Sequence, residues 1–114
     1  GDIISDLGAA TVGGLGMAAS AELGLHHGLF QGAHGSAPDI AGQDVASPIA
    51  TILSGALMLR WLADRHTDDA LHQAADRVEQ AVEDVLLYGD AIPHDQGGHA
   101  RCTEVTQDVC RRLR

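Results

Sequence analysis

Residues 47–63, SPIATILSGALMLRWLA, are the most regular stretch of the sequence and decide its fold class. Ser47 followed by Pro48 is typical of a helix start, because Ser caps free backbone amides and Pro suits the first helical position. Apolar residues then recur every three or four positions, and further apolar residues widen this stripe. We therefore expect a largely buried helix that other elements of the fold must cover.

Two more helices are expected C-terminal to this stretch. The run Thr67-Asp68-Asp69 places capping and acidic side chains at the positive end of a second helix, which Gly89 ends. Residues 90–101 carry Pro and Gly and indicate a loop. Thr103 can then cap a last helix with its own apolar stripe.

The N-terminal half is richer in glycine and less regular. Residues 2–12 have helical spacing, and the glycine run at 13–16 ends that helix. Residues 17–27 indicate a connection, and residues 28–33 a short strand. A lone strand is unstable, so it either pairs with strands outside this chain or is not a strand. Residues 34–47 are expected to form an ordered loop.

Size, charge and cysteine content limit the class of protein. The 114 residues are one domain or part of one, with 7 basic and 16 acidic residues and a net charge of −9. Such a surface repels phosphate backbones and anionic lipids, so no nucleic-acid or membrane partner is expected. Cys102 and Cys110 are too far apart on one helix for a disulfide, which suits free thiols in a reducing cytoplasm. The first residue is not Met and the helical pattern begins at once, so we expect a piece of a larger domain.

Two aspartates in the first helix are candidate metal ligands. Asp2 and Asp6 are four residues apart, which places both carboxylates on one side of a helix. Hard oxygen ligands suit Mg²⁺ or Mn²⁺, which keep water or substrate in the rest of their shell. Acids in a first helical turn are also favoured by the helix dipole alone, and spacing by itself favours this simpler interpretation.

The loop HGSAPDIAG at residues 34–42 is the most informative stretch for function. Gly35 and Gly42 allow close approach of the backbone to a ligand. His34 offers a flat ring for stacking, and Asp39 offers a carboxylate that accepts hydrogen bonds from ribose hydroxyls. Composition alone still favours a structural loop over a binding loop.

Taken together, three blocks resemble the β-decarboxylating dehydrogenases, namely the isocitrate, homoisocitrate, 3-isopropylmalate and tartrate dehydrogenases. The blocks are GDIISD at 1–6, VGGLG at 12–16 and HGSAPDIAG at 34–42, and their order and gaps fit, as does PIATILSGALMLR at 48–60. The resemblance covers essentially the whole chain. It implies an α/β, isocitrate/isopropylmalate dehydrogenase-like fold, of which residues 1–114 are the mostly helical C-terminal, nucleotide-binding portion with one or two short strands, an incomplete domain.

The resemblance also implies an activity, which is NAD-dependent and Mg²⁺- or Mn²⁺-dependent oxidative decarboxylation of a 2-hydroxy acid by a cytoplasmic homodimer. Asp2 and Asp6 would then bind the metal, while the catalytic residues lie upstream, so this chain is not expected to be active alone. Asp39 favours NAD, because a carboxylate binds a ribose 2′-hydroxyl and repels a 2′-phosphate. The implied cofactor-binding residues are His34, Gly35, Ser36, Ala37, Asp39, Ile40 and Ser47.

Three positions depart from the family pattern and bear on cofactor affinity: Ser47, Gln31 and Ala19, which replaces a usual Pro. Ser47 stands where the family usually has Asn, and it lacks the two-sided amide contact. Gln31 stands where Glu is common, which removes a charge. Two other functions stay open: a non-catalytic short paralogue that acts as a binding or assembly subunit, and a small metal-binding helical protein. The residues that select among 2-hydroxy acids would lie upstream.

Overall fold

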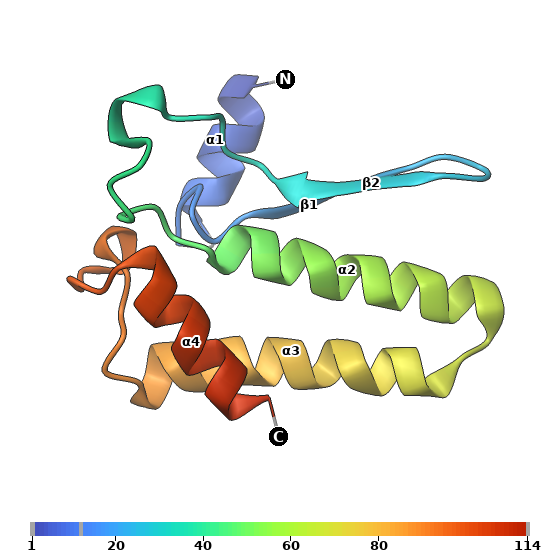
Figure 1. Cartoon of the computed structure of the whole chain (residues 1–114). Helices are drawn as coiled ribbons and strands as arrows, with labels where there is room; N and C mark the ends of the chain where they lie inside the picture. Colours follow the sequence, from blue (N-terminus) through green and yellow to red (C-terminus); the bar gives the residue numbers. More distant parts are fainter. Residues whose placement is uncertain (1, 12, 114) are drawn as a thin grey trace.

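The computed structural model describes residues 2–11 and 13–113, without the side chains of Asp2, Ser5, Asp6 and Ala9. Gly1 and Val12 of the quoted motifs lie outside this part. The elements are α1 (Asp2–Ala10), β1 (Ala19–Leu23), β2 (Gly28–Gly32), α2 (Ile49–His66), α3 (Asp69–Tyr88) and α4 (Cys102–Arg112), with 3₁₀ turns at Pro38–Ile40 and His94–Gln96. Figure 1 shows α2 and α3 as an antiparallel pair, with the β-hairpin along α2 and α4 against α3. Within the described ranges, no helix has the length and apolar character needed to cross a membrane.

The hydrophobic core lies where α2, α3 and α4 meet. Its centre is formed by the buried side chains of Ile49, Val82, Val85, Val105 and Val109. The valines of α3 and α4 are spaced three and four residues apart, so each helix turns one apolar face inward. The loops that leave these helices therefore start from rigid positions.

The starts and ends of α2 and α3 confirm the capping patterns in the sequence. The Asp68 carboxylate accepts a hydrogen bond from the Ala70 amide at 2.9 Å, and Gly89 follows the last residue of α3. Ser47 Oγ accepts a weak hydrogen bond from the Ile49 amide at 3.4 Å, although Pro48 takes the cap position itself. This shift of one residue lies within the usual uncertainty of a helix boundary.

The strand predicted at residues 28–33 is confirmed, but the prediction that it has no partner in this chain is wrong. β2 pairs antiparallel with β1, which lies inside the stretch predicted as a connection. The β1 sequence, ASAEL, lacks the β-branched and aromatic residues that mark strands, so no local pattern indicated it. Its pairing depends on contacts with α2 instead.

An aromatic contact joins the hairpin to α2. The ring of Phe30 packs against Trp61 with 5.7 Å between the ring centroids. The Arg65 guanidinium lies 4.7 Å from the centroid of Trp61 on the same helix, and its Nη1 donates to the Leu25 carbonyl at 3.0 Å. These contacts hold both the middle and the tip of the hairpin.

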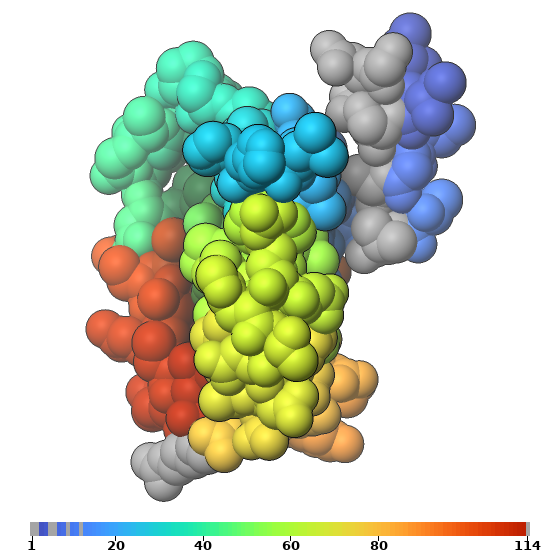
Figure 2. All heavy atoms as spheres, turned by 90° about the vertical axis from the view of Figure 1, so that its right-hand side faces the viewer, coloured from blue at the N-terminus to red at the C-terminus, as the bar shows by residue number. Residues whose placement is uncertain are grey.

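By contrast, α1 packs against no other helix or strand in the part of the chain that the structure describes. Figure 2 shows it as a projection beside the main body. Its apolar side chains Ile3, Ile4 and Leu7 are exposed. A helix that exposes an apolar face of this kind normally contacts a partner.

Candidate functional site

The loop between β2 and α2 forms one wall of the candidate site. Pro38–Ile40 make a single 3₁₀ turn, which Ala37 precedes in the left-handed region at φ 42°. Gly42 follows at φ 78°, a conformation that glycine adopts without strain. Ala37 has a Cβ and is less favoured there, and such local strain is common in ligand-binding loops. The predicted ordered loop is confirmed.

A cavity of about 610 Å³ opens beside this loop. Most of its surface is apolar, with a few polar groups, which is the composition typical of sites for small molecules and cofactors. Residues far apart in the sequence meet there, because Leu15 and Gly16 precede the hairpin and His94 and Asp95 follow α3. Five of the seven predicted cofactor-binding residues line it, namely His34, Gly35, Ala37, Ile40 and Ser47.

The other two predicted cofactor-binding residues lie nearby but not in this cavity. Ser36 lines a neighbouring hollow of about 460 Å³, which shares His34, Gly35, Ala37 and Ile40 with the first. Asp39 is exposed on the 3₁₀ turn and lines neither space, and its main-chain oxygen accepts from Gln43 Nε2 at 2.9 Å. The role of Asp39 therefore stays a prediction.

The His34 ring has a defined hydrogen-bonding state. Its Nδ1 lies 3.1 Å from the Gly35 carbonyl oxygen. Because a carbonyl only accepts, Nδ1 carries the proton and donates it. In the neutral ring, Nε2 is then an acceptor. The ring also lies close to Gly32, where a Cβ would overlap with it.

The loop after α3 supplies the opposite wall, and no sequence pattern predicted this role. Gln96 Nε2 donates to the Gly13 carbonyl at 2.7 Å and so links two residues 83 positions apart. The Asp95 carboxylate lies against Gly16, leaving no room for a Cβ at that position. Gly16 is therefore needed for close packing, while α1 ends at Ala10, before the glycine run that was expected to end it. The nearby Pro93 and Gly97 indicated an ordered turn, but not its partner.

The start of α4 differs from the prediction. Thr103 was expected to be at its cap position, but that position is taken by Arg101, two residues earlier, and the helix begins at Cys102. Asp44 caps it from the loop instead: its carboxylate accepts from the Thr103 amide at 3.1 Å and from Thr103 Oγ1 at 2.6 Å. The Asp44 carbonyl also accepts from the Cys102 amide at 2.8 Å. An acid 59 positions before its partner gives no local signal in the sequence.

The two candidate metal ligands, Asp2 and Asp6, lie on successive turns of α1, as their spacing predicted. Their side chains lie outside the part of the chain that the structure describes. In that part, no three His, Cys, Asp or Glu side chains are grouped closely enough to hold a metal ion. The role of Asp2 and Asp6 as metal ligands therefore stays a prediction.

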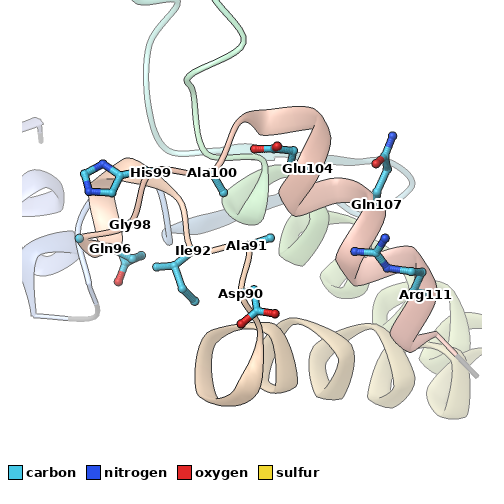
Figure 3. A pocket seen from close by; sticks show the side chains of 11 residues that line it. Asp90, Ala91, Ile92, Gln96, Gly98, His99, Ala100, Glu104, Gln107 and Arg111 are labelled. Carbon is cyan, nitrogen blue, oxygen red and sulfur yellow. The ribbon is translucent and has the colours of Figure 1, made fainter.

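A larger hollow, of about 860 Å³, lies between α4 and the loop after α3 (Figure 3). Glu104, Gln107 and Arg111 follow one another along α4 on one side of it. The Glu104 carboxylate is already used, since it accepts from the Arg101 amide at 2.7 Å. No residue predicted to bind cofactor or metal lines this space.

The fold and its loop place the chain in a known class. The family model of isocitrate/isopropylmalate dehydrogenases matches residues 1–109, and the chain belongs to this family. It is 52% identical over 114 residues to the 3-isopropylmalate/3-methylmalate dehydrogenase of Methanocaldococcus jannaschii, covering 100% of this chain and 32% of the relative. It is 42% identical to the probable NAD isocitrate dehydrogenase alpha subunit, mitochondrial, of Drosophila melanogaster, covering 99% of this chain and 28% of that one.

Solved structures confirm the predicted fold class. The isocitrate dehydrogenase of Methylococcus capsulatus superposes with a TM-score of 0.89 at 36% identity, covering 99% of this chain and 32% of that one. A β-decarboxylating dehydrogenase of Thermococcus kodakarensis gives a TM-score of 0.83 at 36% identity, covering 99% and 31%. The chain thus spans about a third of the length of the relatives it matches.

Proposed function

We propose that the protein containing this chain catalyses NAD-dependent, Mg²⁺- or Mn²⁺-dependent oxidative decarboxylation of a 2-hydroxy acid of the isocitrate, homoisocitrate or 3-isopropylmalate type. This chain supplies the site for the adenosine end of NAD and two metal aspartates. One observation carries the proposal: five predicted cofactor-binding residues line a single, mostly apolar cavity. The names of the two relatives support it, since one is an NAD isocitrate dehydrogenase subunit and the other a 3-isopropylmalate/3-methylmalate dehydrogenase.

The residues of the cavity fit the adenosine portion of a dinucleotide. Leu15, Ile40 and Val45 provide apolar surface for a flat base. His34 contributes a flat ring to the cavity lining, and Gly35 has no side chain that would keep a ligand away from the backbone. Asp39 on the exposed turn adds negative charge, which favours a ribose hydroxyl over a 2′-phosphate and therefore NAD over NADP.

The metal chemistry depends on α1. Asp2 and Asp6 would each offer carboxylate oxygens to Mg²⁺ or Mn²⁺. When bound, such an ion would polarise the oxygen of the hydroxy acid, and NAD would accept the hydride. In this chain Asp2 and Asp6 would bind and orient the ion, and the loop at 34–47 would position NAD. We further propose that the full-length protein is a cytoplasmic homodimer, in keeping with the free thiols of Cys102 and Cys110.

A Gly35→Val variant tests the nucleotide site in the natural polypeptide that contains this chain. A Cβ at Gly35 meets no atom within 4 Å, so the variant should fold. Because Gly35 lines the cavity, the larger valine side chain should reduce the space for the nucleotide. We expect calorimetry to show NAD binding to the parent and at least roughly tenfold weaker binding to the variant, the equivalent of about 1.4 kcal/mol. Gly55→Val on α2, where a Cβ likewise meets no atom within 4 Å, is the matched control. A parent that binds no NAD, or a variant equal to the parent, contradicts the proposal.

The alternative of a non-catalytic binding or assembly subunit is favoured by one observation. The apolar side chains of Ile3, Ile4 and Leu7 on α1 are exposed. In an assembly subunit, they would contact a longer homologue. Co-purification with such a homologue, together with no NAD binding by the isolated protein, would favour this function over the dehydrogenase.

A further inference from the structure

Asp44 has an unusual position at the end of the candidate nucleotide loop. Its backbone is left-handed, at φ 59°, a conformation that Asp tolerates better than most residues. The next three residues, Val45, Ala46 and Ser47, all line the cavity. The orientation of Asp44 therefore determines how this wall of the cavity is placed.

Hydrogen bonds to α4 fix that orientation. Both carboxylate oxygens and the carbonyl of Asp44 accept from the first residues of α4, as described above. The free amides at a helix start and the positive end of its dipole favour a carboxylate there. The helix is itself held by Val105 and Val109 in the hydrophobic core, so the attachment point is rigid.

Little else attaches the loop to the rest of the fold. Ser47 makes two weak bonds, to the Gly16 carbonyl at 3.5 Å and from the Ile49 amide at 3.4 Å. Among the described residues, every other hydrogen bond that joins residues 34–47 to another element involves Asp44. The other hydrogen bonds of these residues stay within the loop, such as Gln43 to Asp39 and His34 to Gly35. Residues 34–39 are exposed. Without Asp44, we expect the loop to sample many more conformations.

We propose that Asp44 is a positioning residue for the dinucleotide, which acts by tying the nucleotide loop to the start of α4. This inference rests on the proposed function of the loop. Asp44 does not contact the reacting atoms. It lowers the cost of ordering the loop, so its loss weakens nucleotide binding and leaves the chemical step unchanged.

The test uses four variants of the natural polypeptide that contains this chain. Asp44→Gly removes the carboxylate and keeps a residue suited to the left-handed backbone. Thr103→Val removes only the hydroxyl partner, and Thr103→Ser retains it. Asp90→Gly, at an exposed aspartate after α3, is the matched control for losing an acid and gaining a glycine.

We expect Asp44→Gly to raise the Kd for NAD and for ADP-ribose roughly three- to tenfold, the size expected from losing one or two net hydrogen bonds. The KM for NAD should rise with it, while kcat stays within about twofold and binding of nicotinamide mononucleotide is unchanged. Thr103→Val should show a smaller effect in the same direction. Thr103→Ser and Asp90→Gly should match the parent. The double variant Asp44→Gly/Thr103→Val should be no weaker than Asp44→Gly alone, because both changes remove one interaction.

Hydrogen exchange without nucleotide keeps this inference separate from the proposed function. Faster exchange across residues 34–47 in Asp44→Gly, with the core helices unchanged, supports the tie to α4. If exchange or the Kd for ADP-ribose in Asp44→Gly equals that of the parent, the inference is overturned. If the parent binds no NAD at all, the proposed function fails, and with it the positioning role, while the exchange data still decide whether Asp44 holds the loop.

Discussion

At the scale of the residue, the loop at 34–42 separates what spacing alone indicates from what the fold adds. Composition by itself favoured a structural loop, and the family pattern favoured a nucleotide loop. The structure places His34, Gly35, Ala37, Ile40 and Ser47 around one cavity, a grouping that follows from the turn at Pro38–Ile40. His94 and Asp95 complete it, and they were not predictable because the turn at His94–Gln96 is held against residues 13–16 by tertiary contacts of Asp95 and Gln96.

Asp39 is the residue on which the proposed preference for NAD over NADP depends. It is exposed on the 3₁₀ turn, so substitution should leave the fold intact. We expect Asp39→Lys to weaken NAD binding and strengthen NADP binding, shifting the ratio of their Kd values by at least roughly tenfold, because a cation pairs with the 2′-phosphate that a carboxylate repels. Calorimetric titration with both nucleotides measures the shift. Asp39→Asn separates loss of the acid from gain of the cation, and an unchanged ratio in both variants would exclude Asp39 from the site.

At the scale of the element, the sequence predicted the helices and strand β2, but it did not predict strand β1. Periodic apolar residues, the Asp68 cap and Gly89 define α2 and α3 locally. Strand β1 carries no such signal, because its stability comes from β2 and α2 and not from its own residues. The start of α4 differs from the prediction for the same kind of reason, since Asp44 caps it from a distant part of the chain.

Another tertiary contact joins α2 to α3. The Arg60 guanidinium donates to the Glu79 carboxylate at 2.6 Å and to the Asp76 carboxylate at 2.8 Å, and these bonds raise the pKa of Arg60 above its ordinary value.

The hairpin should be the first element to detach when its contact with α2 is removed. Trp61→Ala deletes the ring that packs against Phe30 and under Arg65. We expect the free energy of unfolding to fall by about 2 kcal/mol, less than for a fully buried Trp because Trp61 is only half-buried. Hydrogen exchange should rise at residues 19–32 before it rises in α3. Exchange that rises equally in both would mean that the hairpin is not a separate unit.

At the scale of the whole molecule, the chain spans about a third of the length of its relatives, and it exposes apolar side chains on α1. The exposed apolar residues of α1 and the absence of packing between α1 and the other described elements indicate that further protein contacts it. The proposed metal ligands Asp2 and Asp6 belong to this same helix. The cavity proposed for the nucleotide, by contrast, is lined on both sides by residues of this chain.

We propose that the cavity between the loop at 34–47 and the turn at His94–Gln96 receives the adenosine end of NAD. Hydrogen exchange of the natural polypeptide with and without saturating ADP-ribose tests it most directly. We expect slower exchange at residues 34–47 and 94–97, with no change at Gln107 and Arg111, which line the larger hollow from α4. Protection confined to these α4 residues, or no protection anywhere in this chain while the nucleotide is bound, would contradict the proposal.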